Sequence, residues 1–73
     1  MGNNQLKNQI RRLRFENGEI TQQQLADLVG VTRQTILAIE AGNYSPSLTL
    51  AFKIANAFNV PLETAFQYED KNT

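Results

Sequence analysis

Three polar side chains, Arg33, Gln34 and Thr35, stand together just before a segment that turns apolar. Arg can form a bidentate contact with guanine and Gln with adenine, while Thr offers a hydroxyl or a methyl group. The N-terminus of a helix also attracts phosphate through its free N–H groups and its dipole. These residue types therefore indicate contacts with nucleic acid if they start a helix. An ordinary solvated helix face is the alternative.

Other kinds of chemistry find little support in the composition. The chain has no Cys, which excludes a disulfide and a Cys-based zinc site. It also has no His, the commonest general base and metal ligand. No motif places two carboxylates together. We therefore expect no enzyme activity, no metal, no cofactor and no small-molecule ligand. No apolar run approaches the ~20 residues that span a bilayer, and no signal-peptide pattern opens the chain, so we expect a cytoplasmic protein without membrane contact.

The polar trio must be positioned by a short series of helices. Asn8 is a candidate cap for a first helix that ends at Asn17-Gly18. Thr21, with Gln24 three residues later, forms a capping box for a second helix that runs to about Val29. Thr32 caps a third helix that ends at Ala41-Gly42.

Two further helices complete the expected core. Ser45 or Ser47 caps a fourth helix with Pro46 near its first turn, and Val60-Pro61 breaks it. Pro61 then starts a short fifth helix. The segment before Asn8 is a flexible start or an edge, and the last residues alternate like a short strand.

The second and third helices are joined very closely, since only Gly30 and Val31 separate them. A pair of helices with such a Gly-containing turn is typical of a helix-turn-helix. Ala26 permits close approach of the third helix, while Ile36 and Ile39 anchor that helix in the core. The polar trio must then point outward. With 73 residues, the chain is predicted to be one all-α domain, residues 1–73, with five helices and a short two-stranded edge formed by the termini.

The stretch "TQQQLADLVGVTRQTILAIEAGNYSPSL" resembles the phage repressor and Cro family of helix-turn-helix transcriptional regulators. The resemblance covers residues 10–66, with the helix-turn-helix unit at 21–41. It implies that the third helix enters the major groove, where the base-reading positions are Arg33, Gln34, Thr35 and Ala38. The positions implied to contact phosphate are Gln22, Gln23, Thr32, Asn43 and Tyr44.

The same resemblance implies a salt bridge between Arg14 and Glu40 and a homodimer without a separate effector domain. Leu62, Phe66 and Tyr68 are the candidate interface residues. The two aromatic side chains belong to the core or to an interface, since a monomer this small must bury an aromatic ring on a short edge or pair it. We therefore expect a regulator of transcription, a repressor, that binds an inverted-repeat operator in double-stranded DNA. The turn "NGEIT" is one residue longer than the usual turn of the family.

Charge supports this prediction only weakly. The net charge is zero, although residues 1–36 carry five Lys and Arg against three acidic residues, and residues 37–73 carry two against four. Domains that bind nucleic acid are often basic. A protein-interaction or antitoxin-like module on the same fold is therefore the alternative.

Overall fold

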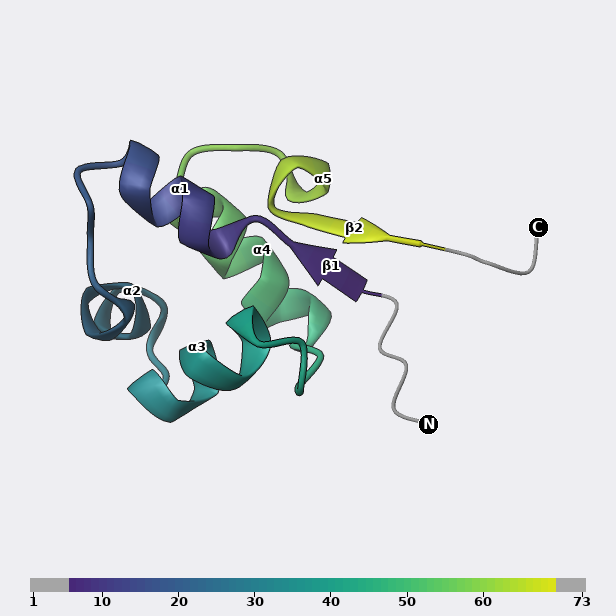
Figure 1. Ribbon diagram of the computed structural model, residues 1–73, viewed down its shortest axis with the longest axis horizontal. Coiled ribbons are helices and arrows are strands. Elements are labelled where there is room, and N and C mark those ends of the chain that lie inside the picture. The colour runs from purple at the N-terminus through teal and green to yellow at the C-terminus, as the bar shows by residue number, and fades with distance from the viewer. Residues whose placement is uncertain (1–5, 70–73) are drawn as a thin grey trace.

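The computed structural model describes residues 6–69, and in this range the chain is mostly helical (Figure 1). The elements are β1 (Leu6–Asn8), α1 (Ile10–Glu16), α2 (Gln22–Val29), α3 (Arg33–Glu40), α4 (Leu48–Ala57), α5 (Leu62–Ala65) and β2 (Phe66–Tyr68). The expected class, five helices with a two-stranded edge, is confirmed. None of the helices between residues 6 and 69 has the length and apolarity needed to cross a membrane.

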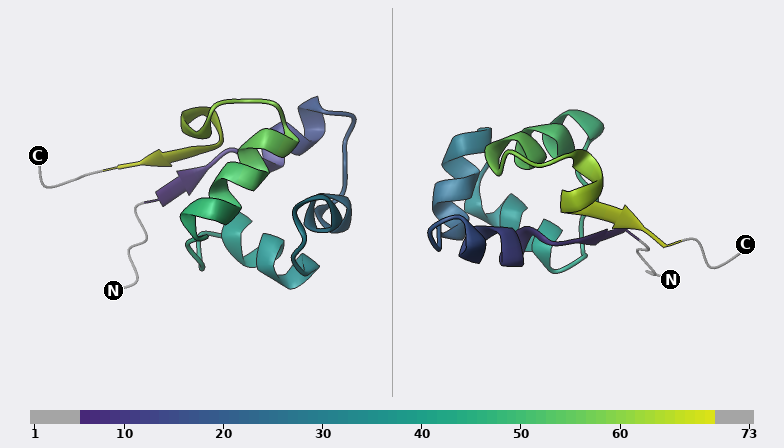
Figure 2. Two further views of the ribbon diagram at one scale, coloured as in Figure 1. Left: turned by 180° about the vertical axis from the view of Figure 1, so that it is seen from behind. Right: turned by 90° about the horizontal axis from the view of Figure 1, so that it is seen from above.

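The two strands form a small antiparallel sheet in which Leu6 pairs with Tyr68 and Asn8 with Phe66. The sheet lies at one end of the molecule, and α2 lies at the opposite end (Figures 1 and 2). A salt bridge of 3.4 Å between Lys7 Nζ and a carboxylate oxygen of Glu69 joins β1 to the residue just after β2, on the surface. The sheet thereby ties the start of α1 to the end of α5.

Helix starts follow the predicted capping residues in the middle of the chain. The Oγ1 atom of Thr21 accepts from the Gln24 N–H at 3.0 Å, and the Gln24 side chain accepts from the Thr21 N–H at 2.8 Å. The hydroxyl of Thr32 accepts from the Thr35 N–H at 3.3 Å. Ser47, and not Ser45, caps α4 by accepting from Leu50 N–H. At α2, α3 and α4, the side-chain oxygen of the N-cap residue therefore satisfies a free N–H group.

Two predicted boundaries are wrong by a few residues. Asn8 lies in β1, and Gln9 is the N-terminal boundary residue of α1, although the Asn8 side chain does accept from the Ile10 N–H at 3.1 Å. Helix α4 ends at Ala57 rather than at Val60-Pro61. It ends there because Asn59 adopts a left-handed backbone with φ of 58°, which a helix cannot continue.

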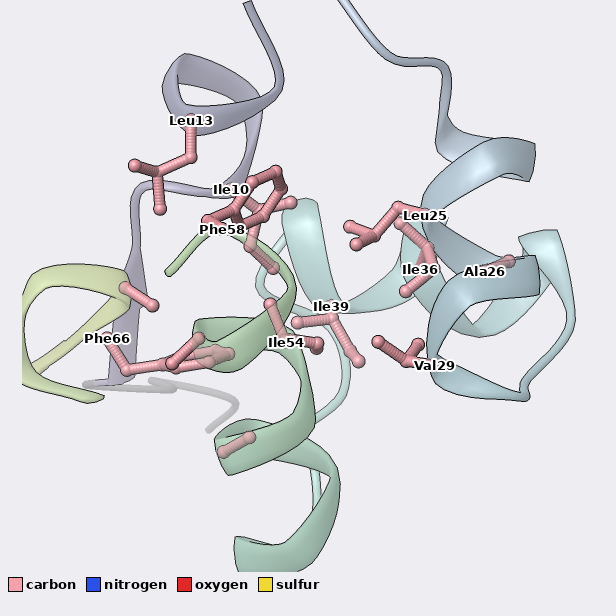
Figure 3. Close-up of a cluster of buried hydrophobic side chains, with 13 residues drawn as sticks. Ile10, Leu13, Leu25, Ala26, Val29, Ile36, Ile39, Ile54, Phe58 and Phe66 are labelled. Atoms are coloured by element: carbon pink, nitrogen blue, oxygen red, sulfur yellow. The ribbon is translucent and has the colours of Figure 1, made fainter. Parts of the chain in front are cut away.

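One core joins all five helices, and Figure 3 shows its side chains converging from every side. Helix α3 contributes Ile36 and Ile39, and α4 contributes Ile54 at the centre. Ile20 and Val31, the residues just before two of the caps, pack against this core and fix the angle at which α2 and α3 begin.

The core also corrects the expectation for Phe66. We expected its ring at a dimer interface, but only 7% of Phe66 is exposed, because it packs into the core beside Ala65. Tyr68, two residues later on the same strand, is 70% exposed. Residues two apart in a strand point to the same face, so Phe66 and Tyr68 differ only in that Phe66 reaches the core.

Neighbouring residues of α3 provide a direct test of this packing. Ile36 is completely buried, whereas Leu37 is 43% exposed. We expect Ile36→Ala to lower the free energy of unfolding by about 2–5 kcal/mol, because the deleted side-chain atoms leave a cavity in the core. Leu37→Ala should lower it by less than half as much. Urea denaturation followed by circular dichroism measures both, and equal losses would contradict the assigned orientation of α3.

Candidate nucleic-acid interface

The junction of α2 and α3 sets where the polar trio lies. Gly30 has φ of 79°, a left-handed conformation that glycine adopts without strain. The N–H groups of Gly30 and Val31 both donate to the carbonyl of Ala26, at 2.8 and 3.0 Å. The chain therefore reverses tightly at Gly30 and starts α3 directly against α2, as a helix-turn-helix requires.

The N-terminal half of α3 faces solvent. Arg33 and Gln34 are exposed, and between residues 6 and 69 their side chains make neither a hydrogen bond nor an ion pair. Thr32 and Thr35 differ, since their Oγ1 atoms lie 3.1 Å apart in a shared hydrogen bond. Each hydroxyl can donate once and accept twice, so this pair keeps capacity for a further partner. Thr32 is exposed and Thr35 is half-buried.

Ala38 lies one turn further along α3 and is half-buried. Its methyl group is the only side-chain atom that it can offer to a partner. The position can contact a thymine methyl group at most. The hydrogen-bonding side chains that α3 exposes most therefore belong to its first turn.

A polar cluster of Arg14, Gln22 and Glu40 connects the C-terminal end of α3 to α1 and α2. Arg14 Nε and Nη2 donate to the two oxygens of Glu40 at 2.8 and 3.2 Å, and Gln22 Nε2 donates to Glu40 Oε1 at 3.2 Å. The side chains of Arg14 and Glu40 are only 15% and 11% exposed. The expected pair thus exists as a bidentate, largely buried bridge, and Gln22 extends it to the start of α2.

Arg14 also organises the long turn before α2. Its Nη1 atom donates to the Ile20 carbonyl at 3.0 Å, and its own carbonyl accepts from the Ile20 N–H at 3.2 Å. Between these anchors, Gly18 and Glu19 both have positive φ, 87° and 58°. The extra residue of "NGEIT" is therefore absorbed by two left-handed residues and does not disturb Thr21.

The remaining candidates for phosphate contact lie around α2 and after α3. Gln23 is exposed, but its Nε2 atom donates to Asp27 at 2.9 Å, which places a carboxylate next to it. Asn43 and Tyr44 are exposed in the loop after α3, and the Asn43 N–H donates to the Ala38 carbonyl at 2.9 Å. This bond fixes the loop against the end of α3.

Sequence analysis missed one contact of the site. The Nδ2 atom of Asn8 donates to the carbonyl of Ile39 at 3.0 Å, over a sequence separation of 31. This bond adds a second donor to a carbonyl in the last turn of α3, which also accepts from the Gly42 N–H at 3.0 Å. Asn8 therefore links β1 to α3, and its capping role alone suggested no such partner.

The expected dimer residues lie apart from α3. Leu62 is half-buried against the core on α5, and Tyr68 is exposed on β2. Phe66, between them in sequence, is enclosed by the core and is not available to a partner. In the described range, no group of three or more acidic residues could hold a metal ion.

We expect the buried salt bridge between Arg14 and Glu40 to contribute far more to the free energy of unfolding than an exposed salt bridge does. Replacing Arg14 by Met leaves the Glu40 carboxylate buried without its cation, and we expect the free energy of unfolding to fall by about 3–5 kcal/mol. Arg12 and Glu16 form an exposed i,i+4 pair on the same helix at 3.5 Å. Arg12→Met should therefore cost less than about 0.5 kcal/mol. Chemical denaturation of the two variants measures this difference, and similar losses would refute a buried role for Arg14.

Comparison with known proteins agrees with this geometry. The helix-turn-helix family matches residues 10–64, which include α1 to α4 and all but the last residue of α5. An uncharacterized HTH-type transcriptional regulator of Bacillus subtilis is 48% identical over 67 residues, covering 92% of this chain and 100% of its own. One from Methanocaldococcus jannaschii is 52% identical over 65 residues, covering 89% and 97%.

A third relative is the cryptic phage CTXphi transcriptional repressor of Vibrio cholerae. It is 40% identical over 53 residues, which cover 73% of this chain and 47% of the repressor. The outward polar turn of α3, the tight junction at Gly30 and these relatives lead to one conclusion. The chain belongs to the helix-turn-helix family of DNA-binding transcriptional regulators, of the Cro/C1 type.

Proposed function

We propose that this regulator is a repressor that binds an inverted-repeat operator as a homodimer, with α3 of each copy in the major groove. The observation that carries the proposal is the first turn of α3. There, Arg33 and Gln34 are exposed and unpaired within the described residues, on a helix whose other face is locked into the core. A repressor blocks transcription by occupying its site, and the related phage protein carries that name.

Base recognition is assigned to Arg33, Gln34, Thr35 and Ala38. Arg33 and Gln34 supply the bidentate donors and acceptors that distinguish guanine and adenine in the major groove. Thr35 shares its hydroxyl with Thr32, so one hydroxyl of the pair has a proton left for DNA. Ala38 adds only a methyl contact.

Phosphate contacts are assigned to the two ends of the helix-turn-helix. Gln22 donates one amide hydrogen to Glu40, which leaves its second N–H for a phosphate oxygen. Gln23 lies in the first turn of α2 and Thr32 is the N-cap of α3, where free N–H groups favour anions. Asn43 and Tyr44 would contact the backbone from the loop after α3. These contacts position the protein on the duplex without reading sequence.

The dimer is assigned to the end of the molecule that carries β2. Tyr68 exposes most of an aromatic ring there, and Leu62 lies on the adjoining helix α5. A two-fold pair would bring two α3 helices to half-sites about 34 Å apart, one turn of DNA.

Gln34→Ala tests base recognition. We expect it to weaken operator binding by about 1–3 kcal/mol and to relax the preference at one base pair per half-site, because the bidentate contact is lost. Binding to a library of operator variants, selected and sequenced, measures both effects. An equal loss on every sequence would contradict a base-reading role.

Two further variants calibrate this result. Gln22→Ala should weaken binding to all sequences alike, since phosphate contacts carry no sequence information. Asn56→Ala removes an exposed amide on α4 to which no DNA contact is assigned, and should change nothing. Affinity that does not fall with salt would instead favour the protein-interaction alternative, because DNA binding releases counterions.

Tyr68→Arg tests the dimer. A charged side chain in an apolar contact should shift the protein toward monomer and weaken binding to a full operator more than to a half-site. Sedimentation velocity measures the oligomeric state. Phe15→Arg is the matched control, because Phe15 is 56% exposed on α1 and lies outside the assigned interface. A dimer that persists in Tyr68→Arg, or that is lost in Phe15→Arg, would relocate the interface.

A further inference from the structure

Asn17 closes α1 in a chemically sensitive position. It is the only Asn of the sequence that is followed by Gly. Its Nδ2 atom donates to the Leu13 carbonyl at 2.8 Å, and its own N–H donates to the same carbonyl at 3.0 Å. The side-chain amide thus gives a second hydrogen bond to a carbonyl in the last turn of α1, which reinforces the end of the helix.

The next backbone nitrogen is accessible and unoccupied. Gly18 is exposed, nothing lies within 4 Å of the position where a Cβ would be, and its N–H forms no hydrogen bond within residues 6–69. The following residue, Glu19, holds a left-handed φ of 58° that an L side chain rarely adopts. The turn therefore presents a free nucleophilic nitrogen beside the Asn17 side chain, within a locally strained segment.

We propose that Asn17 is a site of spontaneous deamidation, and that the reaction removes the cap of α1. After a local opening of the turn, the Gly18 nitrogen attacks Cγ of Asn17 and forms a C–N bond. The bond from Cγ to Nδ2 breaks, and Nδ2 leaves as ammonia with the proton that Gly18 gives up. Water then adds to either carbonyl of the cyclic imide, which yields aspartate or isoaspartate.

Other asparagines of the described range lack this combination. Asn8 and Asn59 are followed by residues whose N–H groups are already bonded, Gln9 to Ala65 at 2.9 Å and Val60 to Ala55 at 3.1 Å. Asn56 precedes Ala57 within α4, and Asn43 precedes a tyrosine, whose side chain is far bulkier than the single hydrogen of glycine. Only at Asn17 are a small successor and an unbonded nitrogen found together.

The reaction has a specific structural consequence, because the group that leaves is the group that caps α1. The new carboxylate faces the Leu13 carbonyl without a proton to donate, at the negative end of the helix dipole. Glu16 and Glu19 add further negative charge nearby. Isoaspartate also lengthens the backbone between α1 and Ile20, which Arg14 holds from both sides. Deamidation should therefore loosen the turn before α2.

Ageing the folded chain tests the site. Native protein is incubated at mildly alkaline pH and sampled over time, and peptide mapping by mass spectrometry follows the replacement of NH₂ by OH at each asparagine. We expect Asn17 to react before Asn43, Asn56 and Asn59, with aspartate and isoaspartate resolved by electron-transfer fragmentation. Reaction at any of those three first, or at the same rate, would overturn the proposal.

Two variants test the consequence. Asn17→Ser has a short polar side chain that cannot form the imide, so it should abolish conversion at this position. Asn17→Asp carries the product charge, and its midpoint of thermal unfolding should lie about 2–8 °C below that of Asn17→Ser. A midpoint equal to or above that of Asn17→Ser would show that the charge does not disturb α1.

Discussion

The burial of Ile36 and Ile39 decides what this molecule presents to its surroundings. A helix of eight residues can rotate about its axis unless its apolar side chains are fixed, and here both isoleucines are almost completely enclosed. Because the two isoleucines lie in the core, Arg33 and Gln34 on the opposite side of the helix face solvent. The interface is therefore a consequence of packing on the opposite side of the same helix.

Packing fixes the rotation of α3, while polar contacts fix its ends. The cluster of Arg14, Gln22 and Glu40 joins three helices through one carboxylate, and the Asn8 side chain holds the last turn from the strand. Such contacts add directional constraints that apolar side chains lack, since hydrogen bonds require particular distances and angles. The apolar core provides the driving force, and the polar cluster selects one arrangement.

Much of this arrangement follows from local patterns. Thr21 and Thr32 predict the starts of α2 and α3 because capping depends on a few adjacent residues, and the apolar spacing predicts which face of α3 is buried. The end of α4 was not predictable in this way. It depends on the left-handed conformation of Asn59, which the neighbouring residue types allow but do not require.

Contacts between distant segments were also hidden from local patterns. The burial of Phe66 depends on packing against residues from other helices, and strand alternation alone placed Phe66 and Tyr68 on one surface. The bond from Asn8 to Ile39 and the sharing of Glu40 by Gln22 likewise depend on how helices meet. The base-reading and phosphate assignments remain predictions, since they need the DNA as a partner.

The bond between Asn8 and the end of α3 has a mechanical meaning. Asn8 belongs to the strand that pairs with β2, so this hydrogen bond connects the sheet directly to the end of α3. In a dimer that forms at Tyr68, each three-residue strand would lie between the dimer interface and the α3 of its own copy. Its register would set the distance between two distant recognition helices, and a shift of the sheet would change which operator spacing the protein fits.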